Sequence, residues 1–197
     1  MIICYLGGIG SGKSVSVVKE IIEKKKFVFV NFELKNVKNY HRIKVKDILI
    51  EREKNAYDIN WSFWNEMALK YKGYSIVLDE VHNLIHSRRS MTSMNILMSK
   101  WVSQIRKILC DSEENHLYLI SQTLRKIDVD FRDLIHLFCV CKVVKIEDKV
   151  WIKQYWYNGI DDYLNGICKI KTIFLANPYF EYYDTKKLVF GEDKIYI

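Results

Sequence analysis

Eight residues near the start of the chain form a pattern that could bind a phosphate group. Gly7-Gly8-Ile9-Gly10-Ser11-Gly12-Lys13-Ser14 fits the phosphate-loop pattern G-x-x-x-x-G-K-[ST]. Glycine lets backbone N–H groups approach phosphate oxygens without a Cβ clash. Lys13 can reach the β- and γ-phosphates, and the Ser14 hydroxyl can bind Mg²⁺. The pattern therefore predicts a site for ATP and Mg²⁺.

The position of this loop supports the same interpretation. Such a match arises by chance in roughly one chain in a hundred of this length. Here it lies between residues 1–6, a predicted buried strand, and residues 13–25, whose apolar spacing predicts a helix. A helix that begins at the loop presents its positive N-terminus to the bound anion.

Two adjacent acids follow a second apolar run, Ile76-Val77-Leu78-Asp79-Glu80. At the carboxyl edge of a parallel sheet, Asp79 would lie beside the phosphate loop and hold Mg²⁺ through water. Glu80 would polarise the attacking water as a general base. Such a base favours hydrolysis over a simple kinase reaction.

A polar residue also ends the apolar run at residues 117–121. If this strand neighbours the strand that carries Asp79, Gln122 lies where it could contact the γ-phosphate and respond to its loss. The alternative is an ordinary amide at a strand end.

Strands and helices are predicted to alternate along the chain. Further strands are expected at 27–32, 74–78, 116–121, 135–144 and 149–157, and further helices at 61–72, 94–109 and 129–134. This order predicts an α/β fold with a mainly parallel sheet covered on both faces, and antiparallel strands towards the C-terminus. Residues 34–60 are polar and unassigned, and the residues after 157 show no clear period.

Length and charge limit the function classes. The 197 residues predict one domain, with 49% hydrophobic and 28% charged residues. The formal net charge is +7, and residues 19–54 contain eleven basic and six acidic residues, a net of +5. Such a region is a candidate contact for DNA or another acidic surface.

No secretory signal or membrane span is visible, and the five cysteines lack disulfide spacing. A chain that is soluble, intracellular and not secreted is expected.

Four islands of sequence resemble the FtsK/HerA superfamily of DNA-pumping ATPases. Within that superfamily they are similar to viral genome-packaging ATPases and to the zonula occludens toxin-like (Zot) group. The islands are GGIGSGKS at Gly7–Ser14, IVLDEVH at Ile76–His82, LISQTLRKIDVDFRDL at Leu119–Leu134, and Tyr182-Tyr183-Asp184-Thr185. The toxin-like group usually carries a membrane span and an extra domain, so the bare core resembles instead the compact packaging ATPases of tailless icosahedral viruses.

The resemblance implies a role for each motif residue. Lys13 and Ser14 would bind nucleotide and Mg²⁺, Asp79 and Glu80 would form the Walker B pair, and Gln122 would be the sensor. The implied fold is a RecA-like P-loop NTPase that assembles as a ring, expected to be a hexamer, around duplex DNA.

The resemblance also implies an arginine finger from a neighbouring subunit. Arg106 is the first candidate, because the toxin-like group often carries an arginine on the helix before the sensor strand; the rivals are Arg132, Arg88 and Arg89. Two departures from the group weaken the assignment of Arg106. It lacks the usual following His, and the acidic stretch Asp111–Glu114 separates it from the sensor strand.

Several weaker patterns have simpler interpretations. Asp79-Glu80-Val81-His82 matches the DExH of helicases, but 197 residues cannot hold two RecA-like halves. His82 and His86 have metal-ligand spacing without further ligands nearby, and core packing explains Cys139 and Cys141 beside His136 better than a metal site does. The aromatic residues Trp151, Tyr155, Trp156 and Tyr157, interleaved with Lys149 and Lys153, could stack on single strands or pack as a hairpin face.

The sequence therefore predicts a single P-loop ATPase domain over 1–197, with the phosphate loop at 7–14, Walker B at 76–80 and a C-terminal hairpin and tail at 135–197. The favoured function is an ATP-hydrolysing motor that moves viral double-stranded DNA into a preformed capsid, in the host cytoplasm or on the capsid. A capsid or portal-vertex protein is a further expected partner. The alternatives are a Zot-like assembly or secretion ATPase acting on protein and membrane partners, and a small-molecule phosphotransferase.

Overall fold

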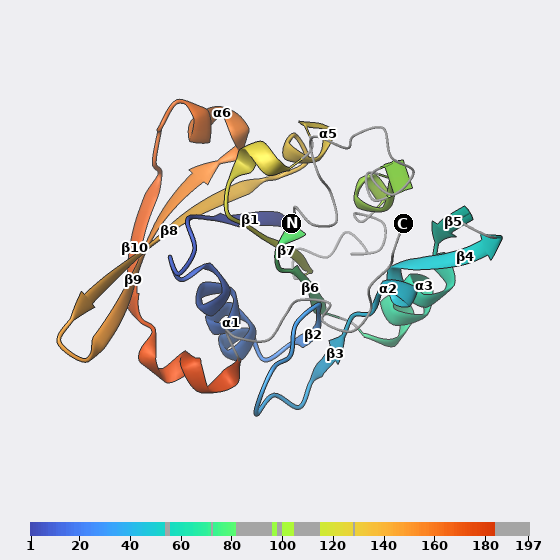
Figure 1. The fold of residues 1–197 in the computed structure, drawn as a ribbon, viewed down its shortest axis with the longest axis horizontal. Coiled ribbons are helices and arrows are strands. Elements are labelled where there is room, and N and C mark those ends of the chain that lie inside the picture. The colour runs from blue at the N-terminus through green and yellow to red at the C-terminus, as the bar shows by residue number, and fades with distance from the viewer. Residues whose placement is uncertain are drawn as a thin grey trace.

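One large sheet organises the chain. The computed structural model describes residues 1–53, 56–71, 73–81, 96–97, 100–104, 115–127 and 129–183. The sheet has eight strands in the order β10-β9-β8-β1-β7-β6-β2-β3 (Figure 1). Its strands are β1 (Ile2–Leu6), β2 (Phe27–Val30), β3 (Tyr40–Arg42), β6 (Tyr74–Leu78), β7 (His116–Ser121), β8 (Leu137–Ile146), β9 (Lys149–Asn158) and β10 (Ile170–Leu175).

The strands from β8 to β3 run parallel, whereas β9 pairs antiparallel with β8 and β10 pairs antiparallel with β9. β7 lies between β1 and β6, so the strand before the phosphate loop does not touch the strand that ends in Asp79. This arrangement confirms the predicted fold class, a P-loop NTPase fold with a mainly parallel sheet and antiparallel strands towards the C-terminus.

Helices and short turns surround the sheet. They are α1 (Lys13–Lys24), α2 (Val45–Ile48), α3 (Trp61–Lys70), α5 (Val129–Arg132), α6 (Gly159–Leu164), η3 (Leu124–Lys126) and η4 (Asn177–Tyr182). α1 and η4 contact each other and lie on one side of the sheet, whereas α5 and α6 lie on the other (Figure 1). Among the helices that the structure describes, none combines the length and apolarity needed to cross a membrane.

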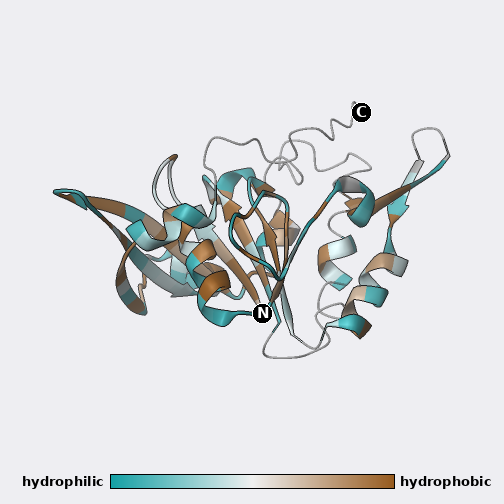
Figure 2. Ribbon diagram, turned by 90° about the horizontal axis from the view of Figure 1, so that it is seen from below, coloured by the Kyte–Doolittle hydropathy of each residue, from teal (hydrophilic) through white to brown (hydrophobic). Residues whose placement is uncertain are grey.

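Alternating side chains of the central strands build two separate cores, because successive residues of a strand point to opposite faces. In β1, Ile3 and Tyr5 pack with Val17 and Val18 of α1. Cys4 packs on the opposite face, in the cluster that contains Trp64 of α3. Figure 2 shows these hydrophobic strands as brown ribbons inside the molecule. Burial on both faces explains why the central strands could be recognised as continuous apolar runs.

The structure contains further elements in two regions that the sequence pattern left unassigned. Residues 34–60 hold β3, α2 and a separate hairpin of β4 (Leu49–Glu53) and β5 (Ala56–Ile59). After residue 157 come α6, the edge strand β10 and η4. In the predicted helix 94–109, the described residues 96–97 and 100–104 are helical.

Candidate functional site

The phosphate loop connects the end of β1 to the start of α1. Gly7, Gly10 and Gly12 adopt positive φ angles of 149°, 71° and 92°, a region that side chains other than glycine rarely enter. The Nζ of Lys13 donates hydrogen bonds to the carbonyls of Gly7 at 2.9 Å and Gly8 at 2.8 Å. The loop is thus folded around its own lysine, in front of the N-terminus of a 12-residue helix.

Two of these glycines are also required by close packing. A Cβ on Gly7 would lie 2.9 Å from the carbonyl oxygen of Cys141 in β8, and a Cβ on Gly12 would lie 2.3 Å from Cδ1 of Ile152 in β9. A Cβ on Gly8 would meet nothing within 4 Å. The loop therefore rests directly on the antiparallel end of the sheet.

Ser14 and Asp79 meet although 65 residues separate them. The Ser14 hydroxyl donates to Oδ2 of Asp79 at 2.9 Å. Burial raises the pKa of the Asp79 carboxyl, and the hydrogen bonds from Ser14 and from the backbone N–H of Glu80 oppose that rise. Burial also lowers the pKa of Lys13, against the attraction of Asp79 and Glu80. The two predicted Mg²⁺ ligands thus lie in contact.

Asn31, which the sequence analysis did not single out, holds the backbone of Asp79 from both sides. Its Nδ2 donates to the Asp79 carbonyl at 2.9 Å, and its Oδ1 accepts from the Asp79 N–H at 2.8 Å. Asn31 follows β2 and is fully buried. A polar residue directly after an apolar strand was the signal that could have found it.

Glu80 stands beside this pair in an uncommon backbone conformation. Its φ is +52°, in the left-handed region that costs a non-glycine residue energy and that is often found at functional sites. Its N–H donates to Oδ1 of Asp79 at 2.7 Å. The side chain is half-buried.

Gln122 lies at the same edge of the sheet. Leu6 of β1 is in register with Ser121 of β7. The residues that follow these two are Gly7 and Gln122, so the backbone of Gln122 lies beside the start of the phosphate loop. Its Oε1 accepts from Nζ of Lys126 at 3.3 Å. β7 places Gln122 between the loop and the strand of Asp79, as the sequence analysis expected of a strand neighbouring β6.

Arg132, one rival for the arginine finger, is bound within its own chain. Its Nε donates to the Ile127 carbonyl at 2.8 Å and its Nη2 donates to the Arg125 carbonyl at 3.1 Å. Both carbonyls belong to the turn around η3 that carries Lys126. Arg132 therefore braces the segment that follows Gln122.

Tyr183 comes close to the site from the C-terminal side. It forms an isolated bridge with Leu34, and the Lys35 N–H donates to the Tyr182 carbonyl at 2.7 Å. Burial and the negative charge of Asp79 raise the pKa of Tyr183 to about 12. The second tyrosine of the Tyr-Tyr-Asp-Thr island thus lies near Asp79.

Other predicted residues lie apart from this site or outside the described residues. Outside are Arg106, Arg88, Arg89, His82, His86, Asp184, Thr185 and the stretch Asp111–Glu114. The described residues hold no group of three side chains suited to a metal ion. Cys139 and Cys141 are buried beneath α1, and Nδ1 of His136 accepts from the Ile2 N–H.

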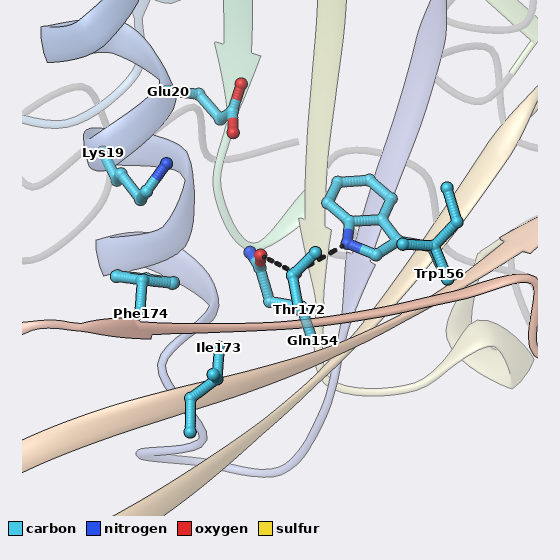
Figure 3. A pocket seen from close by; sticks show the side chains of 8 residues that line it. Lys19, Glu20, Gln154, Trp156, Thr172, Ile173 and Phe174 are labelled. Atoms are coloured by element: carbon cyan, nitrogen blue, oxygen red, sulfur yellow. Dashed lines mark hydrogen bonds between the residues drawn. The ribbon is translucent and has the colours of Figure 1, made fainter.

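A pocket of about 330 Å³ lies between α1, β9 and β10. Figure 3 shows Lys19 and Glu20 of α1 facing Gln154 and Trp156, whereas Ile173 points to the other side of the sheet. Thr172 donates to Gln154 and accepts from Trp156. No residue of the phosphate loop lines this pocket, so it is separate from the site described above.

The residues present fit a nucleotide and Mg²⁺. The Ser11 hydroxyl is buried without a hydrogen-bond partner among the described residues, inside a loop whose glycines leave the backbone accessible. The Ser14 hydroxyl and the Asp79 carboxylate are the oxygen ligands that Mg²⁺ prefers. Together with the ammonium of Lys13 and the helix N-terminus, they suit an anionic phosphate chain with its cation.

Comparisons with known proteins add a likeness of fold. No protein-family model matches the chain, and no curated protein matches it in sequence. Among solved structures, the chain is similar to the N-terminal domain of zonular occludens toxin from Neisseria meningitidis, with 16% identity, a TM-score of 0.54 and coverage of 92% of this chain and 98% of that chain. At this identity the likeness shows the fold alone.

Two further matches are to genome-packaging proteins. The genome packaging NTPase B204 from Sulfolobus turreted icosahedral virus 2, in complex with AMPPCP, is 13% identical with a TM-score of 0.49, covering 87% of this chain and 95% of that chain. B204, the DNA-packaging ATPase from Sulfolobus turreted icosahedral virus, is 15% identical with a TM-score of 0.45, over the same shares of the two chains.

Proposed function

We propose that this chain is an ATP-hydrolysing motor of the FtsK/HerA superfamily that moves double-stranded DNA, in the setting of viral genome packaging. The observation that carries the ATPase part is the 2.9 Å contact between Ser14 and Asp79. It joins two motifs that lie 65 residues apart in the sequence, next to Glu80 and Lys13. The superfamily, the DNA and the virus rest on the sequence islands.

The chain's own residues supply most of the chemistry. The N–H groups of the loop and of the first turn of α1 would bind the phosphate oxygens, and Lys13 would exchange its bonds to Gly7 and Gly8 for bonds to the phosphates. Glu80 would accept a proton from the attacking water. Mg²⁺, held by Ser14 and by Asp79 through water, would neutralise charge on the β- and γ-phosphates.

A ring of subunits belongs to the same proposal. An arginine finger stabilises the charge that develops during phosphoryl transfer, and Arg132 donates its hydrogen bonds to its own chain. An arginine from a neighbouring subunit, with Arg106 as the candidate, would complete the site. A hexamer, a portal-vertex partner, a single domain over 1–197 and a place in the host cytoplasm or on the capsid are parts of this proposal.

One alternative shares the same ATPase site. A Zot-like assembly ATPase would use Lys13 and Glu80 in the same way on protein and membrane partners, and the fold shared with the zonular occludens toxin domain suits both functions. A phosphotransferase is less favoured, because Glu80 beside Asp79 serves a water molecule better than an acceptor alcohol.

The test measures ATP hydrolysis with and without duplex DNA. We expect duplex DNA to stimulate the wild-type rate, and Glu80→Gln to lower that rate by about 10²- to 10⁴-fold while nucleotide binding is retained, because a general base contributes a factor of this size. Glu66→Gln, an exposed glutamate on α3, is the matched control and should keep the wild-type rate.

Hydrolysis without any response to DNA in the assembled ring would favour the assembly ATPase. Full activity of Glu80→Gln would show that Glu80 is not the general base.

A further inference from the structure

The outer face of the antiparallel end of the sheet carries four lysines. Antiparallel register partners share a face. Lys142 pairs with Lys153, Ile146 with Lys149, and Tyr155 with both Val140 and Lys171. We call this surface the basic face, and define it by Lys142, Lys149, Lys153 and Lys171 with the aromatic residues Trp151 and Tyr155.

Beyond its base, no described helix packs over the basic face. The opposite face of the same strands packs on α1 and holds the pocket of Figure 3. On the outer side, α6 covers only the base, where Tyr163 contacts Phe138 and Tyr157. All four lysines are exposed, while Trp151 and Tyr155 are half-buried between them.

The charges on this face are not neutralised within the described part of the chain. None of the four lysines has an ion-pair partner there; the closest contact is Nζ of Lys142 over the ring of Tyr155, at 5.4 Å from its centroid. Lys142 and Lys153 stand directly opposite each other, an arrangement of like charges that destabilises a sheet. An anionic partner would remove this repulsion.

The other basic region of the chain, residues 19–54, is partly neutralised. Lys19 pairs with Glu23, Lys24 with Glu20, and Arg52 with Asp58. These pairs engage three of the eleven basic side chains of this region, whereas none of the four lysines of the basic face has an ion-pair partner among the described residues.

The residue types on the basic face suit contacts with nucleic acid that do not depend on its base sequence. Lysine acts as a point charge towards phosphate, and phosphate contacts carry no base information. The described side chains that alternate onto this face include no Arg, Asn or Gln, the residues that read base edges bidentately. Lys149 and Lys153 are four residues apart, so about 13 Å of strand separates them, which equals the rise of roughly four base pairs along the DNA helix axis.

We propose that the basic face binds the phosphate backbone of duplex DNA without sequence preference. The proposal rests on the proposed function, and it names the surface through which that motor would hold its substrate. Contacts of this kind let a protein move along DNA, since no base pair is preferred over the next.

The test compares two triple variants with equal loss of charge. In the first, Lys142→Gln, Lys153→Gln and Lys171→Gln are combined. The control combines Lys38→Gln, Lys44→Gln and Lys46→Gln, which are exposed lysines of the region 34–60. Affinity for a labelled duplex is measured between low and high salt, with phosphatidylserine vesicles as a second probe.

We expect the first variant to bind duplex DNA at least about tenfold more weakly near 0.1 M salt, with a salt slope smaller by roughly 3, because each lost phosphate contact removes about 0.9 from the slope. The control should bind as the wild type does. Folding is checked with Lys153→Glu, which should unfold at the same or a higher temperature because it replaces the repulsion with Lys142 by an attraction, while it weakens DNA binding.

Each opposite result has a separate meaning. If the wild type binds the duplex and the first triple variant binds equally well, or if the control loses as much affinity, the basic face is not the DNA surface and the motor still stands. If the wild type binds vesicles but no duplex, both the basic face as a DNA surface and the DNA motor are wrong.

Discussion

Asn31 determines where Asp79 stands, because it hydrogen-bonds both polar groups of the Asp79 backbone. The carboxylate of Asp79 then has its two oxygens directed at Ser14 and at the N–H of Glu80. Asn31 touches none of the reacting groups itself. It is a positioning residue, and it fixes the acid to the neighbouring strand β2 rather than to β6 alone.

Replacing Asn31 by Ala should therefore affect both stability and the response to Mg²⁺. We expect a loss of about 1–3 kcal/mol in the free energy of unfolding, since the Asp79 N–H and carbonyl lose their partners. The gain in nucleotide affinity on adding Mg²⁺ should fall by about tenfold or more, as for other residues that orient a metal ligand. Chemical denaturation and nucleotide titrations with and without Mg²⁺ measure the two effects.

Asn115→Ala is the matched control. Asn115 is also buried, and its Oδ1 accepts from the Tyr74 N–H at the opposite end of β6. It should cost similar stability and leave the Mg²⁺ response unchanged. An equal Mg²⁺ effect in both variants would show that Asn31 acts only through stability.

The sequence predicted site residues that belong to short local motifs, but not residues whose partners lie far away along the chain. Lys13, Ser14, Asp79 and Glu80 could be found because each belongs to a local pattern with a chemical reason. The partnership of Asn31 with Asp79 spans 48 residues, and it depends on β2 lying next to β6, which no local pattern records.

At the scale of elements, the segment after β7 behaves as one unit. Lys126 of η3 holds Gln122, and Arg132 of α5 holds two carbonyls of the same turn. If Gln122 contacts the γ-phosphate as proposed, a change there would reach α5 through hydrogen bonds within one subunit. This geometry gives Arg132 a role in its own chain.

Mixed assemblies distinguish this role from that of a finger. Arg132→Ala should lower ATP hydrolysis, and mixing it with Glu80→Gln should give only the sum of the two separate rates, because the defect stays with its own site. Arg106→Ala mixed with Glu80→Gln should exceed the sum, since a Glu80→Gln subunit still supplies Arg106 to its neighbour. If the mixture of Arg132→Ala and Glu80→Gln hydrolyses ATP faster than the sum of the two separate rates, Arg132 is the finger instead.

Strands could be predicted from the sequence where both faces of the sheet are buried. β1, β6 and β7 are apolar at nearly every position, and the pattern alone identifies them. β3 and β10 lie at the edges of the sheet, and most β10 side chains are exposed. β3 has only three residues, and in β10 Lys171 and Thr172 interrupt the apolar residues, so neither shows the continuous apolar pattern of a strand buried on both faces. The order of the strands, and with it the position of β7 between β1 and β6, follows from long-range pairing.

At the scale of the whole molecule, the phosphate loop packs against β8 and β9, two of the strands that carry the basic face. Gly7 lies against the Cys141 carbonyl, and Gly12 lies against Ile152. The next residues along these strands, Lys142 and Lys153, belong to the basic face. A shift of the phosphate loop on binding nucleotide would therefore press on the strands that carry the lysines, through backbone and side-chain contact.

This contact predicts a reciprocal coupling between ATP and DNA. A nucleotide analogue should raise the affinity for duplex DNA in the wild type, and DNA should raise the affinity for the nucleotide by the same factor. Ile152→Val removes Cδ1, the atom that occupies the space where a Cβ on Gly12 would lie, at a cost of about 0.5–1.5 kcal/mol in stability. We expect this variant to bind each ligand alone as the wild type does and to lose most of the coupling factor. Ile21→Val, in the same core but at the far end of α1, should keep it. Equal coupling in both variants would mean that the two sites communicate by another route, because the loop's contact with β9 would then carry none of the free energy that links them.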